Sequence, residues 1–89
     1  MKEFEFTIGH PLGIHARPAG QLVQLSSRFE SEATVTLERS GRSASLKRLL
    51  AVMGLGAKGG DRLLVRIEGR DEKEAQAAIE GWLREHLGM

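Results

Sequence analysis

The residue best suited to chemistry in this sequence is a histidine that lies three positions before a proline. His15 is followed by Ala16, Arg17 and Pro18, and a proline is well tolerated in a helix only within the first turn. We therefore expect a helix to begin near Ala16, with His15 at or next to its N-cap. The first N–H groups of a helix lack intrahelical partners and carry a partial positive charge that attracts anions. Because the guanidinium of Arg17 suits a phosphoryl group, this arrangement predicts a phosphorylated histidine.

A site of this kind asks little more of the protein. Phosphoryl transfer depends mainly on alignment and on stabilisation of the charge on the phosphoryl oxygens. A carrier must also release the group again, so a few amide contacts and one mobile, partly solvated Arg17 suit a relay better than a closed cage. On composition alone, a lone histidine beside a glycine is usually a loop residue or a helix cap. The helix start, Arg17 and Pro18 are what favour a chemical role for His15.

The other two histidines have weaker claims to a function. His10 lies in the loop before the site, where we expect it to be solvated. His86 falls at the end of the last predicted helix, where a cation complements the negative end of the helix dipole, so we expect its role to be structural. The three histidines do not have the spacing of metal ligands. The sequence therefore predicts neither a metal nor a cofactor.

Size and composition limit the class of protein. The 89 residues, 40% of them hydrophobic, suffice for one core, so we expect a single domain over residues 1–89. With no cysteine, disulfides and thiolate metal sites are excluded. No apolar run has the character of a signal peptide or the ~20 residues of a membrane span, so we expect a cytoplasmic protein without membrane insertion. A net charge of +1, without tyrosine or a basic stripe, argues against a nucleic-acid-binding module.

The hydrophobic pattern predicts an α+β framework around the site. Alternating apolar residues predict strands over residues 3–8, 33–38, 43–46 and 62–68. Helical spacing predicts helices over 16–29, 47–53 and 72–86, the last with Asp71 as its cap and Glu74 in the capping-box position. The order is β-α-β-β-α-β-α. Because each strand is apolar on one face only, we expect a four-stranded antiparallel sheet with three helices on one face, an open-faced sandwich.

Each longer helix should bury one face against this sheet. In the first helix the predicted buried face consists of Pro18, Ala19, Leu22, Val23, Leu25 and Phe29. In the last helix the apolar repeat consists of Ala75, Ala78, Ile79, Trp82, Leu83 and His86. This packing would leave the N-terminal tip of the first helix accessible.

Residues 13–19, with the sequence GIHARPA, resemble the active-site motif of HPr, the histidine-containing phosphocarrier of the bacterial phosphotransferase system. Residues 46–56 resemble the second conserved segment of that family, and the length and order of elements agree over the whole chain. The resemblance implies an HPr-like fold and a phosphocarrier, not an enzyme, that is mostly monomeric. It also implies that Nδ1 of His15 accepts the phosphoryl group (as a pros-phosphohistidine), that Ala16 and Arg17 bind it, that enzyme I, charged from phosphoenolpyruvate, donates it, and that enzyme IIA domains receive it.

The resemblance further implies a surface on which enzyme I and IIA domains dock beside His15. A flexible methionine there suits a surface that must fit several partners in turn. On spacing alone, the apolar residues of the short second helix would be core residues, and we expect at least one of them to be so. The residues of this docking surface are Ala16, Gly20, Gln21, Arg48, Leu49, Leu50 and Met53.

The chain departs from the family pattern at two places. Many HPr proteins carry a regulatory serine, the target of a kinase, at the start of the second helix, where this chain has Arg48. That switch should be absent, leaving docking permanently permitted or favouring an acidic partner. The alternative function is a regulatory, nitrogen-type HPr-like protein that is phosphorylated on His15 and controls partner proteins instead of sugar uptake. The turn over residues 38–42 also looks longer than the connection common in the family.

One glycine pattern needs a separate interpretation. Residues 54–59 spell G-x-G-x-x-G, the pattern of dinucleotide-binding loops. Such a loop follows a strand and opens a helix, whereas these glycines follow a predicted helix and precede a strand. We interpret them as turn glycines.

Overall fold

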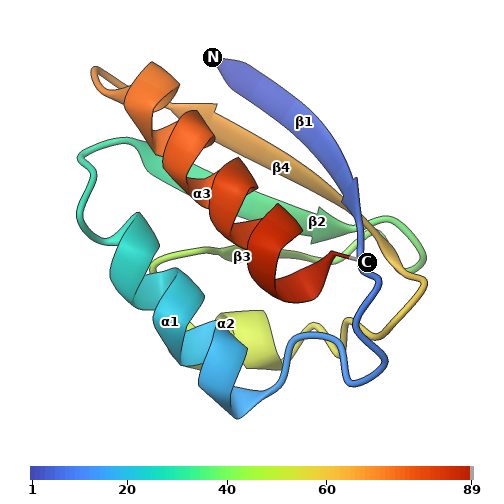
Figure 1. Cartoon of the computed structure of the whole chain (residues 1–89). Helices are drawn as coiled ribbons and strands as arrows, with labels where there is room; N and C mark the ends of the chain where they lie inside the picture. The colour runs from blue at the N-terminus through green and yellow to red at the C-terminus, as the bar shows by residue number, and fades with distance from the viewer. Residues whose placement is uncertain (89) are drawn as a thin grey trace.

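The predicted order of elements is present in the computed structural model, which describes residues 1–88 (Figure 1). The strands are β1 (Lys2–Thr7), β2 (Glu32–Leu37), β3 (Ser43–Ser45) and β4 (Arg62–Glu68). The helices are α1 (Ala16–Ser26), α2 (Leu49–Met53) and α3 (Glu72–Leu87). Over the described residues, no helix combines the length and the apolar character that crossing a membrane requires.

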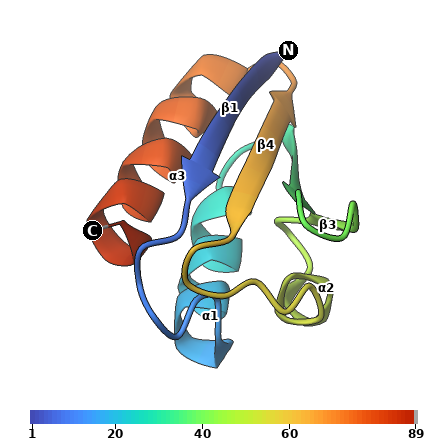
Figure 2. The ribbon, with the colours of Figure 1, turned by 90° about the vertical axis from the view of Figure 1, so that its right-hand side faces the viewer.

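The strands form one antiparallel sheet in the order β1-β4-β2-β3. The central register pairs Phe6 with Leu63 and Val35 with Val65. Helices α1 and α3 pack on the same side of the sheet, while α2 packs against α1 and β3 (Figure 2). The other side carries charged and polar residues, such as the ion pair between Arg66 Nε and Glu3 Oε2 at 2.9 Å. The α+β open-faced sandwich is therefore confirmed.

Helix α1 ends three residues earlier than predicted, at Ser26. After that point the hydrogen bonds shorten to three-residue steps, with the N–H of Arg28 donating to Leu25 and that of Phe29 to Ser26. Three residues of the predicted buried face, Val23, Leu25 and Phe29, are only partly buried. The residues that α1 buries are Pro18, Ala19, Leu22 and Ser26. Ser26 was missed because a hydroxyl is an unexpected core group, and its oxygen has no hydrogen-bond partner among the described residues.

Helix α3 buries a narrower face than the predicted one. Its buried residues are Ala75, Ile79, Leu83 and Leu87. These residues follow one another at four-residue steps, so Leu87, not His86, continues the buried row after Leu83. Trp82 is half-buried and His86 is exposed. The prediction of a buried stripe ending at His86 is therefore wrong.

The prediction of a capping box at the start of α3 is also wrong, because Asp71 and Glu74 do not make the hydrogen bonds that define it. Asp71 is the N-cap residue, but its side chain makes no capping hydrogen bond to its own helix. Its carboxylate instead accepts the backbone N–H groups of Glu30 and Ser31, both at 2.9 Å, and the hydroxyl of Ser31. Glu72, not Glu74, bonds back to an N–H group, that of Gly69 at 3.1 Å. The start of α3 is thus fastened to the connection between α1 and β2.

These contacts predict an acid-sensitive contribution to stability. The hydroxyl of Ser31 and the N–H of Glu30 lower the pKa of Asp71 below its usual value, so the ionised form stabilises the fold. The contribution is complete above the unfolded-state pKa of about 3.9 and is lost as the pH falls through the lower native pKa. Asp71→Asn should therefore lower the free energy of unfolding in urea at pH 7, and the gap to the parent protein should narrow by pH 3. A gap that stays the same at both pH values would contradict this.

Candidate functional site

His15 is the N-cap residue of α1, as the sequence predicts. Its backbone is extended, with φ −104° and ψ −171°, and its carbonyl oxygen accepts the first intrahelical hydrogen bond, from the N–H of Ala19 at 2.9 Å. Its side chain is exposed and makes no capping hydrogen bond. The imidazole is therefore accessible at the positive end of a helix, and its ring nitrogens are not engaged by the helix.

The helix tip presents two amides and one guanidinium that are not engaged elsewhere. Among the described residues, neither the N–H of Ala16 nor that of Arg17 donates to a protein acceptor. Pro18 has no N–H, so these two donors are the amides at the tip. The guanidinium of Arg17 is exposed and takes part in no ion pair or hydrogen bond within residues 1–88. Such a tip can bind the oxygens of one phosphoryl group.

An open hollow of about 320 Å³ lies beside His15. It is lined by His10, Leu12, His15, Arg17, Pro18, Gln21, His86 and Leu87, with no carboxylate among them. The hollow therefore favours an anion electrostatically. The exposed Leu12 was not predicted at the site, and as a single leucine in a turn sequence it gives no periodic signal.

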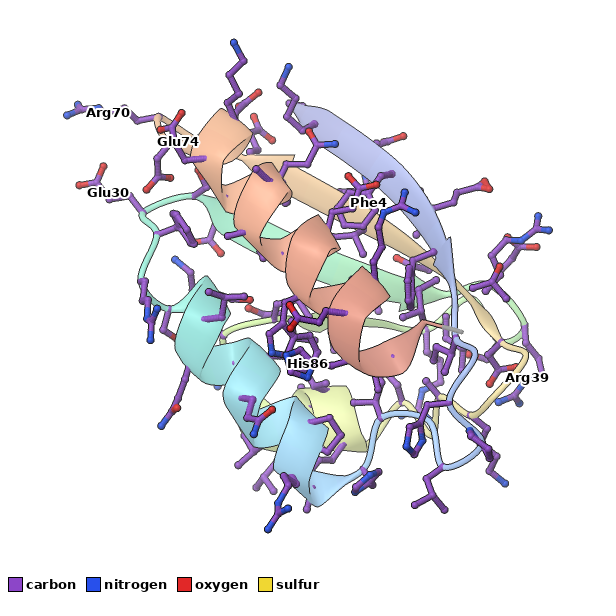
Figure 3. All side chains as sticks on the ribbon, in the orientation of Figure 1. Phe4, Glu30, Arg39, Arg70, Glu74 and His86 are labelled. Carbon is purple, nitrogen blue, oxygen red and sulfur yellow. The ribbon has the colours of Figure 1, made fainter. Side chains whose placement is uncertain are left out.

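Both remaining histidines lie nearer to His15 than the sequence suggests. His10 is half-buried, not simply solvated, and its ring centroid is 6.2 Å from that of His15. Its Nδ1 accepts the N–H of Leu12 at 3.2 Å, which fixes the ring. His86 lies at the end of α3 (Figure 3), with its ring 4.8 Å from that of Trp82. Within residues 1–88, no group of three or more histidine, cysteine or acidic side chains could hold a metal ion.

Gly13 sets the path of the loop that carries His15. Its φ of +66° lies in the left-handed region, and a Cβ on this residue would collide with the carbonyl of Ala57 and the Cα of Lys58. The next residue, Ile14, is buried and donates its N–H to the same Ala57 carbonyl at 3.0 Å. His15 therefore follows a segment packed tightly against the loop between α2 and β4.

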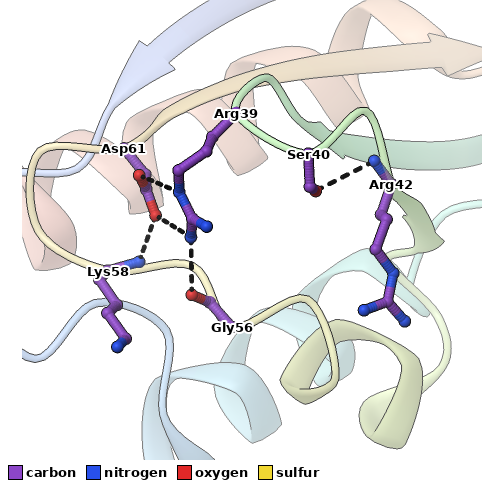
Figure 4. A network of polar contacts seen from close by, with 6 residues as sticks. All are labelled: Arg39, Ser40, Arg42, Gly56, Lys58 and Asp61. Atoms are coloured by element: carbon purple, nitrogen blue, oxygen red, sulfur yellow. Dashed lines mark hydrogen bonds and ion pairs between the residues drawn. The ribbon is translucent and has the colours of Figure 1, made fainter.

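That supporting loop is itself held by the turn between β2 and β3 (Figure 4). Arg39 donates from Nε and Nη2 to the two carboxylate oxygens of Asp61, both at 3.1 Å, and Nη2 lies 3.4 Å from the carbonyl of Gly56. The N–H of Lys58 donates to Asp61 at 2.9 Å. The Arg39 guanidinium and this N–H lower the pKa of Asp61. The turn residue Arg39 thus braces the loop that contacts Gly13 and Ile14.

The residues predicted for the docking surface lie on α1 and α2, which pack against each other. Leu49, Leu50 and Met53 are 41%, 81% and 37% exposed, so the expectation that at least one is a core residue is wrong. Val52 fills that place instead and is fully buried. Val52 is the one buried residue among the five of α2, and the tight turn after the helix buries Leu55. The remaining predicted residues, Ala16, Gly20, Gln21 and Arg48, are exposed or half-exposed.

Comparison with known proteins agrees with this geometry. The sequence profile of the family described as "PTS HPr component phosphorylation site" matches residues 2–85. The phosphocarrier protein HPr of Lysinibacillus sphaericus is 45% identical over 85 residues, which cover 96% of this chain and 94% of that protein. The corresponding protein of Xylella fastidiosa is 42% identical over 79 residues, covering 89% of this chain and 86% of its own length.

The fold agrees equally well. The crystal structure of HPr from Thermoanaerobacter tengcongensis superposes with a TM-score of 0.90 and 32% identity, over 100% of this chain and 98% of that one. The residues that match the family profile, 2–85, include the loop that carries His15, helices α1 and α2 and all four strands of the sheet. The chain therefore belongs to the HPr family of phosphocarrier proteins of the phosphotransferase system.

Proposed function

We propose that this protein accepts a phosphoryl group from phosphorylated enzyme I on His15 and passes it to enzyme IIA domains in sugar uptake. The observation that carries the proposal is the exposed imidazole of His15, next to two unengaged amides and the unpaired guanidinium of Arg17 among the described residues. Membership in the HPr family supports it. We propose further that residues 1–89 act as one domain, as a monomer and in the cytoplasm.

The proposed transfer uses only groups that are present at the helix tip. The unprotonated Nδ1 of His15 attacks the phosphorus atom, a P–N bond forms, and the bond to the donor's leaving atom breaks. The amides of Ala16 and Arg17 and the guanidinium of Arg17 stabilise the charge on the phosphoryl oxygens. In the second transfer, a histidine nitrogen of the acceptor domain attacks the same phosphorus atom, and the P–N bond to Nδ1 of His15 breaks. The protein is a carrier of a covalent intermediate and turns over no substrate by itself.

Arg17 should control the rate of this transfer. Arg17→Ala removes the only cationic side chain on the first turn of α1, so we expect phosphorylation by enzyme I to slow by about 10- to 100-fold. Arg17→Lys should recover part of the rate, since an ammonium keeps the charge but lacks the planar fork. Arg28→Ala, two residues past the C-terminal end of α1, is the matched control. Stopped-flow or quenched-flow rates measure the effect, and equal rates for Arg17→Ala and Arg28→Ala would show that Arg17 has no such role.

Leu50 should matter for docking and not for chemistry. It is the most exposed large apolar side chain of α2, so a carboxylate there would be desolvated against an apolar partner surface. We expect Leu50→Glu to raise the KM for phosphorylation by enzyme I about tenfold with kcat little changed. Ala77→Glu adds the same charge on an exposed position of α3 and should leave both constants unaltered. Equal KM values for the two variants would place the docking surface elsewhere.

The experiment that tests the proposed function is reconstitution of the relay. The purified protein is incubated with enzyme I, phosphoenolpyruvate and Mg²⁺, and its intact mass is measured. We expect one acid-labile phosphoryl group per chain, which disappears when a IIA domain is added and appears on that domain. A chain that stays unphosphorylated contradicts the proposal.

A regulatory function is the second candidate, and Arg48 is the observation that favours it. Arg48 is the exposed N-cap residue of α2, where many family members carry a regulatory serine, and its side chain makes no capping hydrogen bond. A fixed cation there favours an acidic partner. The same reconstitution separates the two candidates. Phosphorylation without transfer to any sugar-specific IIA domain would favour the regulatory, nitrogen-type function.

A further inference from the structure

His86 presents its ring to the site without a role in the proposed transfer. The side chain is exposed in the last turn of α3 and lines the same hollow as His15 and Arg17. Its ring lies against the indole of Trp82, with centroids 4.8 Å apart and planes inclined by 32°. The imidazole of His86 therefore contacts a half-buried side chain of its own helix and remains exposed beside the hollow.

Backbone hydrogen bonds connect the end of α3, which carries His86, to the loop that leads to His15. The N–H groups of Gly9 and His10 both donate to the carbonyl of Leu87, at 2.7 and 3.1 Å. The end of α3 is therefore attached to the start of the loop that leads to His15. At the other end of this loop, Ile14 is attached to Ala57 at 3.0 Å. The loop that leads to His15 is therefore hydrogen-bonded to the end of α3 at its start and to the loop between α2 and β4 at its end.

Among the described residues, those that line the hollows beside His86 include hydrogen-bond donors and cations but no carboxylate. A second hollow, of about 360 Å³, is lined by residues of α1 and α3 and by Arg28, and it shares Gln21 and His86 with the first. Among the described residues that line the two hollows, the titratable and charged groups are His10, His15, Arg17, Arg28 and His86. No ring N–H of His86 donates to a protein acceptor within residues 1–88. The ring N–H of His86 is therefore free to donate a hydrogen bond to an anion in the first hollow.

We propose that His86 contacts the phosphoryl group carried by His15, and that its imidazolium form stabilises the phosphorylated state. This inference rests on the proposed function, since a phosphoryl group on His15 is the anion that enters the hollow. A phosphoryl group brings a charge of about −1.5 to −2. By linkage, a dianion that favours protonated His86 must itself be held more firmly when His86 is protonated. The phosphoryl affinity of the carrier should therefore rise as the pH falls through the titration of this ring.

The test follows the ring of His86 by NMR in the free and the phosphorylated full-length protein. The phosphorylated form is prepared with enzyme I and phosphoenolpyruvate, and in parallel with phosphoramidate as a chemical donor. We expect phosphorylation to move the titration midpoint of His86 upward by about half a pH unit or more. His86→Phe keeps a ring against Trp82 but removes the N–H. It should weaken phosphoryl retention, measured as the exchange equilibrium with enzyme I, about two- to threefold at pH 6 and not at pH 8.5.

The matched control is Lys73→Gln, which removes one exposed positive charge from the other end of α3 and should leave the equilibrium unchanged at both pH values. If His15 becomes phosphorylated but the His86 midpoint stays in place, or His86→Phe matches the parent at pH 6, the inference is overturned while the proposed function stands. If neither donor phosphorylates His15, the proposed function fails and this inference falls with it.

Discussion

His15→Asn is expected to give a folded protein that accepts no phosphoryl group, with a rate at least about a thousandfold below that of the parent protein. Asparagine is among the best N-cap residues, so the start of α1 should be kept or improved. The imidazole itself is exposed and bonds to no part of the described structure, so its loss removes no packing. The variant should therefore lack the acceptor nitrogen while it keeps the structure that positions it.

This prediction is measured by intact mass after incubation with enzyme I and phosphoenolpyruvate, with circular dichroism as the check on folding. His10→Asn is the matched control, since it replaces a histidine whose ring lies 6.2 Å away in the same hollow. The control should still accept one phosphoryl group. Phosphorylation that persists in His15→Asn would assign the acceptor to another residue.

Gly13→Val should be the most damaging change to the fold near the site. The left-handed backbone at Gly13 is strained for a β-branched residue, and any Cβ there would meet the carbonyl of Ala57. We expect a loss of about 3 kcal/mol or more in the free energy of unfolding, a large part of the stability of a domain of this size. The hydrogen bond from Ile14 to Ala57 should be lost as well, which frees the loop that carries His15.

Urea denaturation measures the stability of this variant, and the phosphorylation rate of its folded fraction measures the effect on the site. Gly81→Ala is the control, because Gly81 lies in α3 with open space around it. That change should stabilise the protein by about 0.5–1 kcal/mol through helix propensity. An unfolding free energy for Gly13→Val within experimental error of the parent value would show that the loop can shift without cost.

The part of the site that local rules govern could be predicted from the sequence. The fixed φ of Pro18 placed the helix start, and the helix start placed His15 at the N-cap with two open amides. One-sided alternation predicted the strands, and the antiparallel sheet followed from it. These features depend on neighbours in the sequence, and the structure confirms them.

The features that were missed depend on residues far apart in the chain. Asp71 was expected to cap its own helix, but its carboxylate accepts the N–H groups of Glu30 and Ser31, which lie 41 and 40 residues away in the sequence. The role of Arg39 in bracing the loop at Asp61 could not be foreseen, because the turn that carries it has no local signal for that contact. His86 was placed on the buried face because spacing alone cannot distinguish it from Leu87, which packing selects.

The role of His15 as the phosphoryl acceptor is tested most directly by finding which atom carries the phosphoryl group in the phosphorylated protein. The protein, uniformly labelled with ¹⁵N, is phosphorylated by enzyme I, and the coupling of phosphorus to the ring nitrogens is recorded by NMR. We expect one phosphoryl group per chain, on Nδ1 of His15, with the rings of His10 and His86 unmodified. A phosphoryl group on another residue, or on no residue at all, would contradict this role.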